Sequence, residues 1–151
     1  MKKYTYRPFS FILLALIISA CAKIQPAQPT QSTECQSPTE WKIDFSLSGG
    51  FAGVSRSLSI SSDGSMITQD LRKGEKSTST LSQEELGKIA GMLAQACPFE
   101  GVRIKNRCAD CFEYKLNVMM NGRRYSIETN EISVPDNLSP LIGYLGGFVK
   151  K

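Results

Sequence analysis

Residues 112–127 read FEYKLNVMMNGRRYSI, and this stretch decides the fold class. Apolar and aromatic side chains alternate with polar ones over residues 112–118, which is the period of a strand with one buried face. The dipeptide Asn121-Gly122 follows and is typical of a two-residue turn between antiparallel strands. Apolar alternation then resumes over residues 125–127. The stretch therefore predicts an antiparallel hairpin with one face against a core.

The same alternation occurs earlier in the chain, over residues 41–47 (WKIDFSL) and again over 58–60. Between these two predicted strands lies the glycine-rich segment 49–53 (GGFAG), which predicts a loop. Residues 62–65 (SDGS) predict a tight turn into a further returning strand. We expect residues 72–76 (RKGEK) to form a solvated loop, because every one of them is charged or glycine.

One long helix is predicted over residues 81–96. Ser82 and Glu85 form a capping box at its start, and Pro98 cannot continue it. Near the C-terminus, apolar residues predict a short closing helix that the pair 146–147 (GG) would end. The apolar stripe of the long helix consists of Leu86, Ile89, Ala90, Leu93 and Cys97. The predicted fold class is α+β, with an antiparallel sheet of hairpins packed against one main helix and a short C-terminal helix.

The N-terminus reads as a targeting signal. A charged start precedes the apolar run 9–20, which is shorter than the roughly 20 residues that a membrane-spanning helix needs. The run ends in residues 18–21 (ISAC), a lipobox of the kind that marks bacterial lipoproteins. The pattern predicts cleavage before Cys21, lipidation of Cys21 and, with Ala22 next, an outer-membrane location in the cell envelope. The alternative is a signal peptide cut elsewhere, with Cys21 an ordinary thiol.

Three segments follow from this interpretation: a signal peptide over 1–20, a lipidated flexible tether over 21–40, and one α+β domain over 41–149. The tether is rich in Pro, Gln, Ser and Thr and has almost no apolar residues. Such a composition cannot bury enough surface to offset the entropy lost on ordering.

Charge and composition narrow the classes of function. The chain has 18 basic and 14 acidic residues, and loss of the signal peptide would leave 15 basic ones. With no basic stripe, this near balance argues against nucleic-acid binding. The chain has no histidine, which excludes Ser-His-Asp and Cys-His nucleophile pairs and His-Glu-x-x-His zinc sites. We therefore expect a non-enzymatic binding protein without a metal or cofactor.

Four cysteines remain besides Cys21, and an oxidising envelope favours two disulfides among them, with three possible connectivities. We expect Cys97 to bond with Cys108 or Cys111, and Cys35 to pin the tether to the domain. Cys108 and Cys111 also have the spacing of a redox pair, and a four-cysteine metal site is a third interpretation. The redox interpretation is less favoured because the pair precedes a predicted strand, whereas redox pairs usually lie at the start of a helix. The metal site is less favoured because only one half of its four cysteines has the Cys-x-x-Cys spacing.

The segment 48–53 (SGGFAG), followed by Arg56, resembles the start of emfourin-type proteins, which are small bacterial inhibitors of thermolysin-like (M4, protealysin-type) metallopeptidases. Residues 111–118 (CFEYKLNV) are similar to the family's Phe-x-Tyr-x-Leu-x-Val strand. Residues 134–138 (VPDNL) lead into a similar closing helix, so the resemblance spans about 41–148. A lipid anchor and four cysteines are not general features of that family.

The resemblance implies a lipid-anchored protein inhibitor that blocks the active-site cleft of an M4-type metallopeptidase. Phe51 would enter the pocket in which thermolysin-like enzymes bind a bulky apolar residue just after the cleaved bond. Glycines beside it permit positive φ angles and close backbone approach. In the opposite interpretation, Phe51 belongs to the core and the glycines form a structural bulge. The partner-binding residues implied are Gly49, Gly50, Phe51, Ala52, Gly53 and Arg56.

Two other functions stay open at this stage. One is a non-enzymatic envelope binding module whose partner is a lysozyme, an assembly factor or a surface polymer. The other is an enzyme that uses two carboxylates converging in a pocket. The acidic candidates for such a pair are Asp110, Glu113, Glu128 and Glu131.

Overall fold

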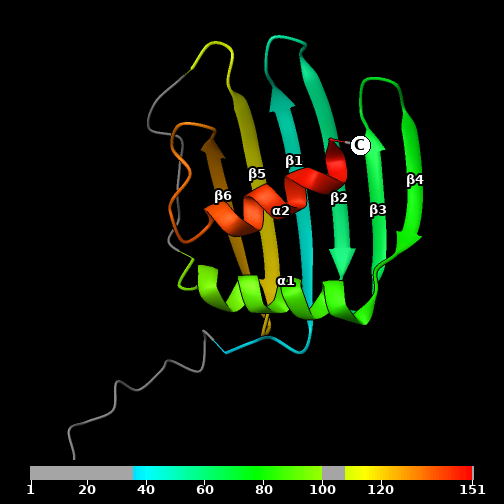
Figure 1. Ribbon diagram of the computed structural model, residues 1–151, viewed down its shortest axis with the longest axis vertical. Helices are drawn as coiled ribbons and strands as arrows, with labels where there is room; N and C mark the ends of the chain where they lie inside the picture. The colour runs from blue at the N-terminus through cyan, green and yellow to red at the C-terminus, as the bar shows by residue number, and fades with distance from the viewer. Residues whose placement is uncertain (1–35, 100–107, 151) are drawn as a thin grey trace, which may run out of the picture. The chain divides into compact units, whose positions relative to one another are not determined.

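A computed structural model describes residues 36–99 and 108–150 of the chain (Figure 1). Four strands come first, then a helix, two further strands and a second helix. No helix within the described ranges is long and apolar enough to cross a membrane. The bounds are β1 Trp41–Gly49, β2 Val54–Ser61, β3 Ser65–Asp70, β4 Glu75–Thr80, α1 Gln83–Ala96, β5 Phe112–Met120, β6 Arg123–Asn130 and α2 Ser139–Val149.

The strands form one sheet in the order β4-β3-β2-β1-β5-β6, and every neighbouring pair is antiparallel. Strands β1 to β4 follow one another as hairpins, whereas the β5–β6 hairpin adds to the other side of β1 after α1. Phe45 of β1 lies opposite both Leu58 of β2 and Leu116 of β5, so these three side chains share a face. The predicted α+β fold class is confirmed.

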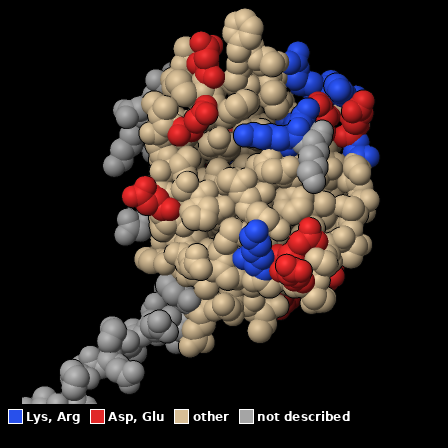
Figure 2. Space-filling model, viewed as in Figure 1, with Lys and Arg blue, Asp and Glu red and all other residues tan. Residues whose placement is uncertain are grey.

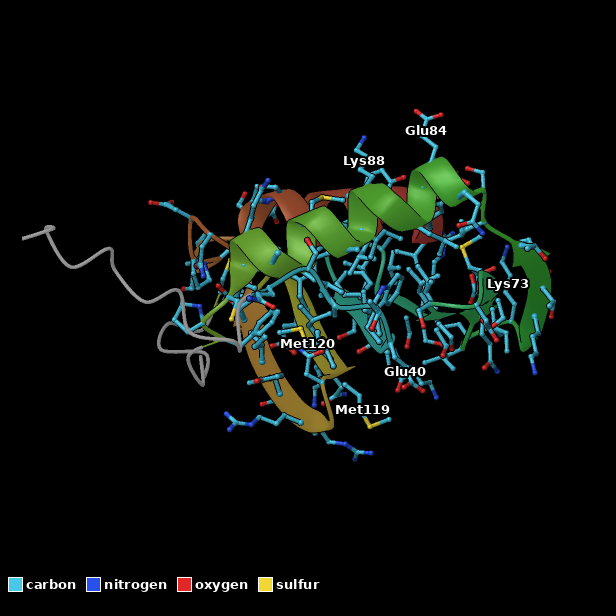
Figure 3. The ribbon with its side chains drawn as sticks, turned by 90° about the horizontal axis from the view of Figure 1, so that it is seen from below. Glu40, Lys73, Glu84, Lys88, Met119 and Met120 are labelled. Carbon is cyan, nitrogen blue, oxygen red and sulfur yellow. A yellow bond between two sulfur atoms is a disulfide. The ribbon has the colours of Figure 1, made fainter. Side chains whose placement is uncertain are left out.

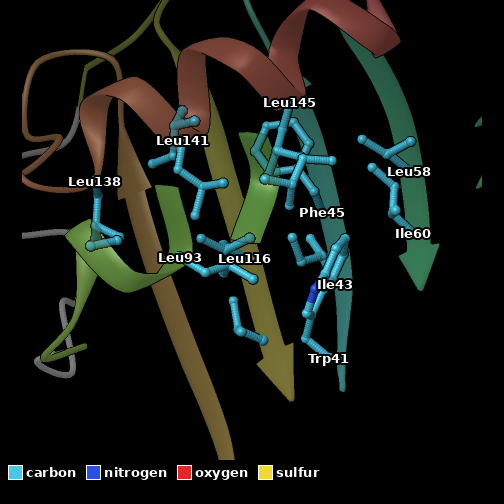
Figure 4. Packing of buried hydrophobic residues seen from close by; sticks show 14 of the residues in the cluster. Trp41, Ile43, Phe45, Leu58, Ile60, Leu93, Leu116, Leu138, Leu141 and Leu145 are labelled. Carbon is cyan, nitrogen blue, oxygen red and sulfur yellow. The ribbon is translucent and has the colours of Figure 1, made fainter. Parts of the chain in front are cut away.

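Both helices cover the same face of the sheet, as Figure 3 shows from below. On this face the alternating residues of the central strands meet the apolar stripes of α1 and α2 (Figure 4). The opposite face carries polar residues of β1 and β2, and no described helix lies over it. The largest fully buried side chains are Phe45, Ile43, Leu47, Leu58, Ile60, Ile89, Leu93, Leu116, Met120, Ile127, Leu138 and Leu141.

The capping box predicted at the start of α1 is present. The backbone N–H of Glu85 donates to the Ser82 hydroxyl at 3.3 Å, and the Ser82 N–H donates to the Glu85 carboxylate at 2.8 Å. These two bonds satisfy donors that the first turn of a helix otherwise leaves unpaired.

The predicted end of the second helix is wrong. Helix α2 continues through Gly146 and Gly147 to Val149. A glycine inside a helix costs about 1 kcal/mol relative to alanine. Gly146 is buried together with Leu145 and Val149, so tertiary packing outweighs that cost.

The loop predicted over residues 72–76 is also wrong in part. The chain turns over residues 71–74, and strand β4 begins at Glu75. All six side chains of β4 are exposed, so no apolar alternation marks it as a strand. Its extended conformation comes from regular pairing with β3, from Ser65 opposite Thr80 to Asp70 opposite Glu75.

Candidate functional site

The glycine-rich segment forms the turn between β1 and β2. Gly49 and Val54 make the last pair of the two strands, and the Gly53 N–H donates to the Gly50 carbonyl oxygen at 2.9 Å to close the turn. Phe51 lies at the tip and is 98% exposed. The interpretation that places Phe51 in the core is therefore wrong, and the turn presents an aromatic ring to solvent.

Two glycines allow the turn to lie directly on the start of β5. Gly49 has a φ of 94°, and a Cβ there would be 2.6 Å from the Cys111 carbonyl oxygen. Gly50 has a φ of 69°, and a Cβ there would be 2.7 Å from the Phe112 ring. The Gly50 N–H also donates to the Cys111 carbonyl oxygen at 3.2 Å. Any larger residue would be both strained and in collision at these positions.

A disulfide fixes the backbone that supports the turn. Cys108 and Cys111 are bonded to each other, with 5.4 Å between their Cα atoms. The prediction that either of them bonds with Cys97 is therefore wrong, because each cysteine forms only one disulfide. Cys97 is itself disulfide-bonded, whereas Cys21 and Cys35 lie outside the described residues.

Arg72 holds the turn from the other side. Its guanidinium donates to the Ala52 carbonyl oxygen at 2.6 Å and to the Gly53 carbonyl oxygen at 2.9 Å. The β3–β4 turn that carries Arg72 is organised by Asp70, whose carboxylate accepts from the backbone N–H of Arg72 at 3.0 Å and of Lys73 at 3.1 Å. The turn with Phe51 is thus held by two segments distant in sequence.

Arg56 does not lie at the tip with Phe51, but contacts the residues that hold the turn in place. Its guanidinium lies 3.5 Å from the Asp70 carboxylate and donates to the Val149 carbonyl oxygen at the end of α2. The pKa of Asp70 lies below its ordinary value, chiefly because the Lys73 N–H donates to the carboxylate, with the Arg72 N–H and the Arg56 charge adding to the effect. Arg56 therefore reaches the tip only indirectly, through Asp70 and Arg72.

The four carboxylates considered for catalysis occupy several parts of the fold. Glu113 and Glu128 lie on the uncovered face of the sheet, and Glu128 is 3.2 Å from the Lys115 ammonium. Asp110 is enclosed in the disulfide ring, and Glu131 follows β6. No group of three or more acidic residues or cysteines that could hold a metal ion occurs within residues 36–99 and 108–150.

Sequence reasoning missed Arg72 and Leu71. The β3–β4 turn places Leu71, which is 51% exposed, at the same end of the sheet as Phe51, because the Leu71 N–H donates to the Ser55 carbonyl oxygen at the start of β2. No motif marks either residue, and their position depends on the pairing of β3 with β2.

No protein-family model matches the chain, and no curated protein matches it.

Proposed function

We propose that this protein is a lipid-anchored inhibitor of a thermolysin-like, M4-type metallopeptidase, and that it acts by placing Phe51 in the active-site cleft. The observation that supports the proposal is an aromatic residue, 98% exposed, at the tip of a turn that is held on both sides. A phenylalanine in a solvent-exposed turn does not contribute to folding stability through burial, because its ring stays in water. A partner that buries the ring recovers the free energy of burial.

The support around the turn favours tight binding. Association is weakened by the entropy lost when flexible groups become ordered at an interface. Here Cys111, Phe112 and Arg72 already fix the backbone on both sides of Phe51. Aromatic residues in well-packed pockets are also among those that contribute most to binding energy.

The direction of β1 suits a protein that is anchored at its N-terminus. The domain begins with Trp41 at one end of β1, and Phe51 follows the other end at Gly49. A strand of this length spans about 30 Å at roughly 3.3 Å per residue. With residues 21–40 as the tether, the tether would join the domain at the Trp41 end of β1, which is the end opposite to Phe51.

The test is a titration of the oxidised domain, residues 22–151 without lipid, against thermolysin cleaving a small peptide substrate. We expect stoichiometric loss of activity for the native protein and at least about 30-fold weaker inhibition for Phe51→Ala. Met119→Ala is the matched control, since Met119 is another exposed apolar residue, with 43% exposure, and lies at the opposite end of the sheet. No inhibition by the folded native protein at large excess, or equal losses for both variants, would contradict the proposal.

A second candidate is a non-enzymatic envelope binding module, and the uncovered face of the sheet favours it. A shallow hollow there is lined by hydroxyl, amide and charged groups, including Ser46, Ser57 and Asn117. The Ser59 hydroxyl donates to the Asp44 carboxylate at 2.8 Å beside it. Such groups suit a surface polysaccharide. Sedimentation with insoluble peptidoglycan tests this candidate. If it holds, Phe51→Ala should still bind and Asn117→Lys should not.

A further inference from the structure

Two positive charges flank the turn that carries Phe51. Arg72 donates to two neutral carbonyl oxygens of the turn, and no described carboxylate forms an ion pair with it. The Lys150 ammonium lies 5.7 Å from the centre of the Phe112 ring, which itself packs against Gly50. Lys150 likewise has no ion pair among the described residues. The charge of both side chains is therefore available to a partner.

A third cation lies next to them. Lys73 follows Arg72 and approaches Glu75 at 4.0 Å, with both side chains largely exposed. An ion pair of this kind contributes little and leaves its members free to interact elsewhere. The basic flank is defined here as Arg72, Lys73 and Lys150.

The other side of the turn carries the opposite charge. Asp110 lies in the disulfide ring that supports Gly50, and Glu131 is joined to Phe112 because its N–H donates to the Phe112 carbonyl oxygen at 3.0 Å. Figure 2 shows acidic side chains at the upper left of the helix-covered side, and at the upper right a group of basic side chains with acidic ones among them. Asp70 and Glu75 belong to the basic side, where Arg56, Arg72, Lys73 and Lys150 outnumber them. The end of the molecule that carries Phe51 is therefore polarised.

We propose that the Phe51 end docks on a peptidase cleft whose rim carries carboxylates on the side that meets the basic flank. This inference rests on the proposed function and adds the electrostatic character of the partner. A single aromatic ring in a pocket does not fix the rotation of the molecule around it. Charges of opposite sign on the two sides select one orientation, and they accelerate association more than they slow dissociation.

The experiment measures the rate of onset of thermolysin inhibition at several ionic strengths. The test variant is Lys73→Glu/Lys150→Glu, which leaves Phe51 and Arg72 intact. The matched control is Lys88→Glu/Arg124→Glu, which changes the net charge equally. Lys88 lies on the outer side of α1 (Figure 3), and Arg124 is in β6 beside the Asn121-Gly122 turn.

We expect the test variant to associate about tenfold more slowly than the native protein at low salt. The difference should vanish near 1 M salt, where screening acts within about 3 Å. The control variant should associate within twofold of the native rate at every salt concentration. Inhibition that is equally slow for both variants, or independent of salt, would overturn this inference while the proposed function stands. Absence of inhibition by the native protein would overturn both.

Discussion

Two hairpin turns lie at opposite ends of the sheet and use glycine in different ways. The β5–β6 turn has φ angles of 51° at Asn121 and 73° at Gly122, as a two-residue turn of primed type requires. A Cβ at Gly122 would meet nothing within 4 Å. The β1–β2 turn, in contrast, needs Gly49 and Gly50 because Cys111 and Phe112 lie directly against them.

The difference separates a turn that only reverses the chain from one that is built to hold a side chain in place. Local residues alone specify the Asn121-Gly122 turn, and it exposes polar neighbours. The turn with Phe51 depends on a disulfide-bonded segment and on Arg72, both distant in sequence. Such external support is unnecessary for reversing a chain, and it is what a rigid binding element requires.

The largest effect on stability is expected when one glycine in each of the two turns is replaced by alanine. Gly49→Ala should lower the free energy of unfolding by about 3 kcal/mol, because the new Cβ would have an unfavourable φ and would collide with the Cys111 carbonyl oxygen. Gly122→Ala should cost about 1 kcal/mol, since only the φ is unfavourable. Urea unfolding of both variants measures the difference. Equal losses would mean that the two turns do not differ in their support.

A smaller effect is expected when the disulfide is removed. Cys108→Ser/Cys111→Ser opens a very short covalent loop, for which the chain-entropy relation gives about 2 kcal/mol of stability. The Gly50 amide should then exchange with solvent faster, because its acceptor is the Cys111 carbonyl oxygen. Hydrogen exchange measured by NMR checks this, with the Gly122 amide as the internal reference. Unchanged exchange at Gly50 would show that the disulfide does not support the turn.

The smallest effect concerns pH. The pKa of Asp70 is lowered in the folded state, so its stabilising contribution is present above the unfolded pKa of about 3.9 and is lost as pH falls through the folded value. We expect the amide signals of Arg72 and Lys73 to shift below about pH 4 in the native protein and to stay constant in Asp70→Asn.

The control for this titration lies in another turn of the same sheet. The pKa of Asp63 is also lowered, chiefly because the Ser65 N–H donates to its carboxylate. Asp63→Asn should leave the titration of the Arg72 and Lys73 amides unchanged. If those amides titrate in Asp70→Asn as they do in the native protein, Asp70 does not organise the turn that carries Arg72.

Patterns that depend on neighbouring residues were predictable from the sequence. The alternation in β1 and β5, the Asn121-Gly122 turn and the Ser82 capping box each require only a few consecutive residues. Strand β4 was not predictable, because all of its side chains are polar and exposed and its partner strand alone keeps it extended. The end of α2 was missed because burial of Gly146 outweighs its low helix propensity.

The site was predictable only in part. The composition of residues 49–53 indicated a loop, but the same residues fitted both a buried and an exposed Phe51. The contacts that decide the question come from Cys111, Phe112 and Arg72, and no local pattern relates these residues to the loop. Disulfide pairing was undetermined for the same reason, since spacing alone allows several connectivities.

The most direct test of the account is calorimetric binding of the native protein to thermolysin, with and without a small inhibitor that fills the zinc site and the adjacent apolar pocket. If Phe51 enters that pocket, the protein should bind the free enzyme with one-to-one stoichiometry, and saturation with the small inhibitor should abolish binding. Equal affinity for the free and the saturated enzyme would contradict the claim that this protein acts by blocking the cleft.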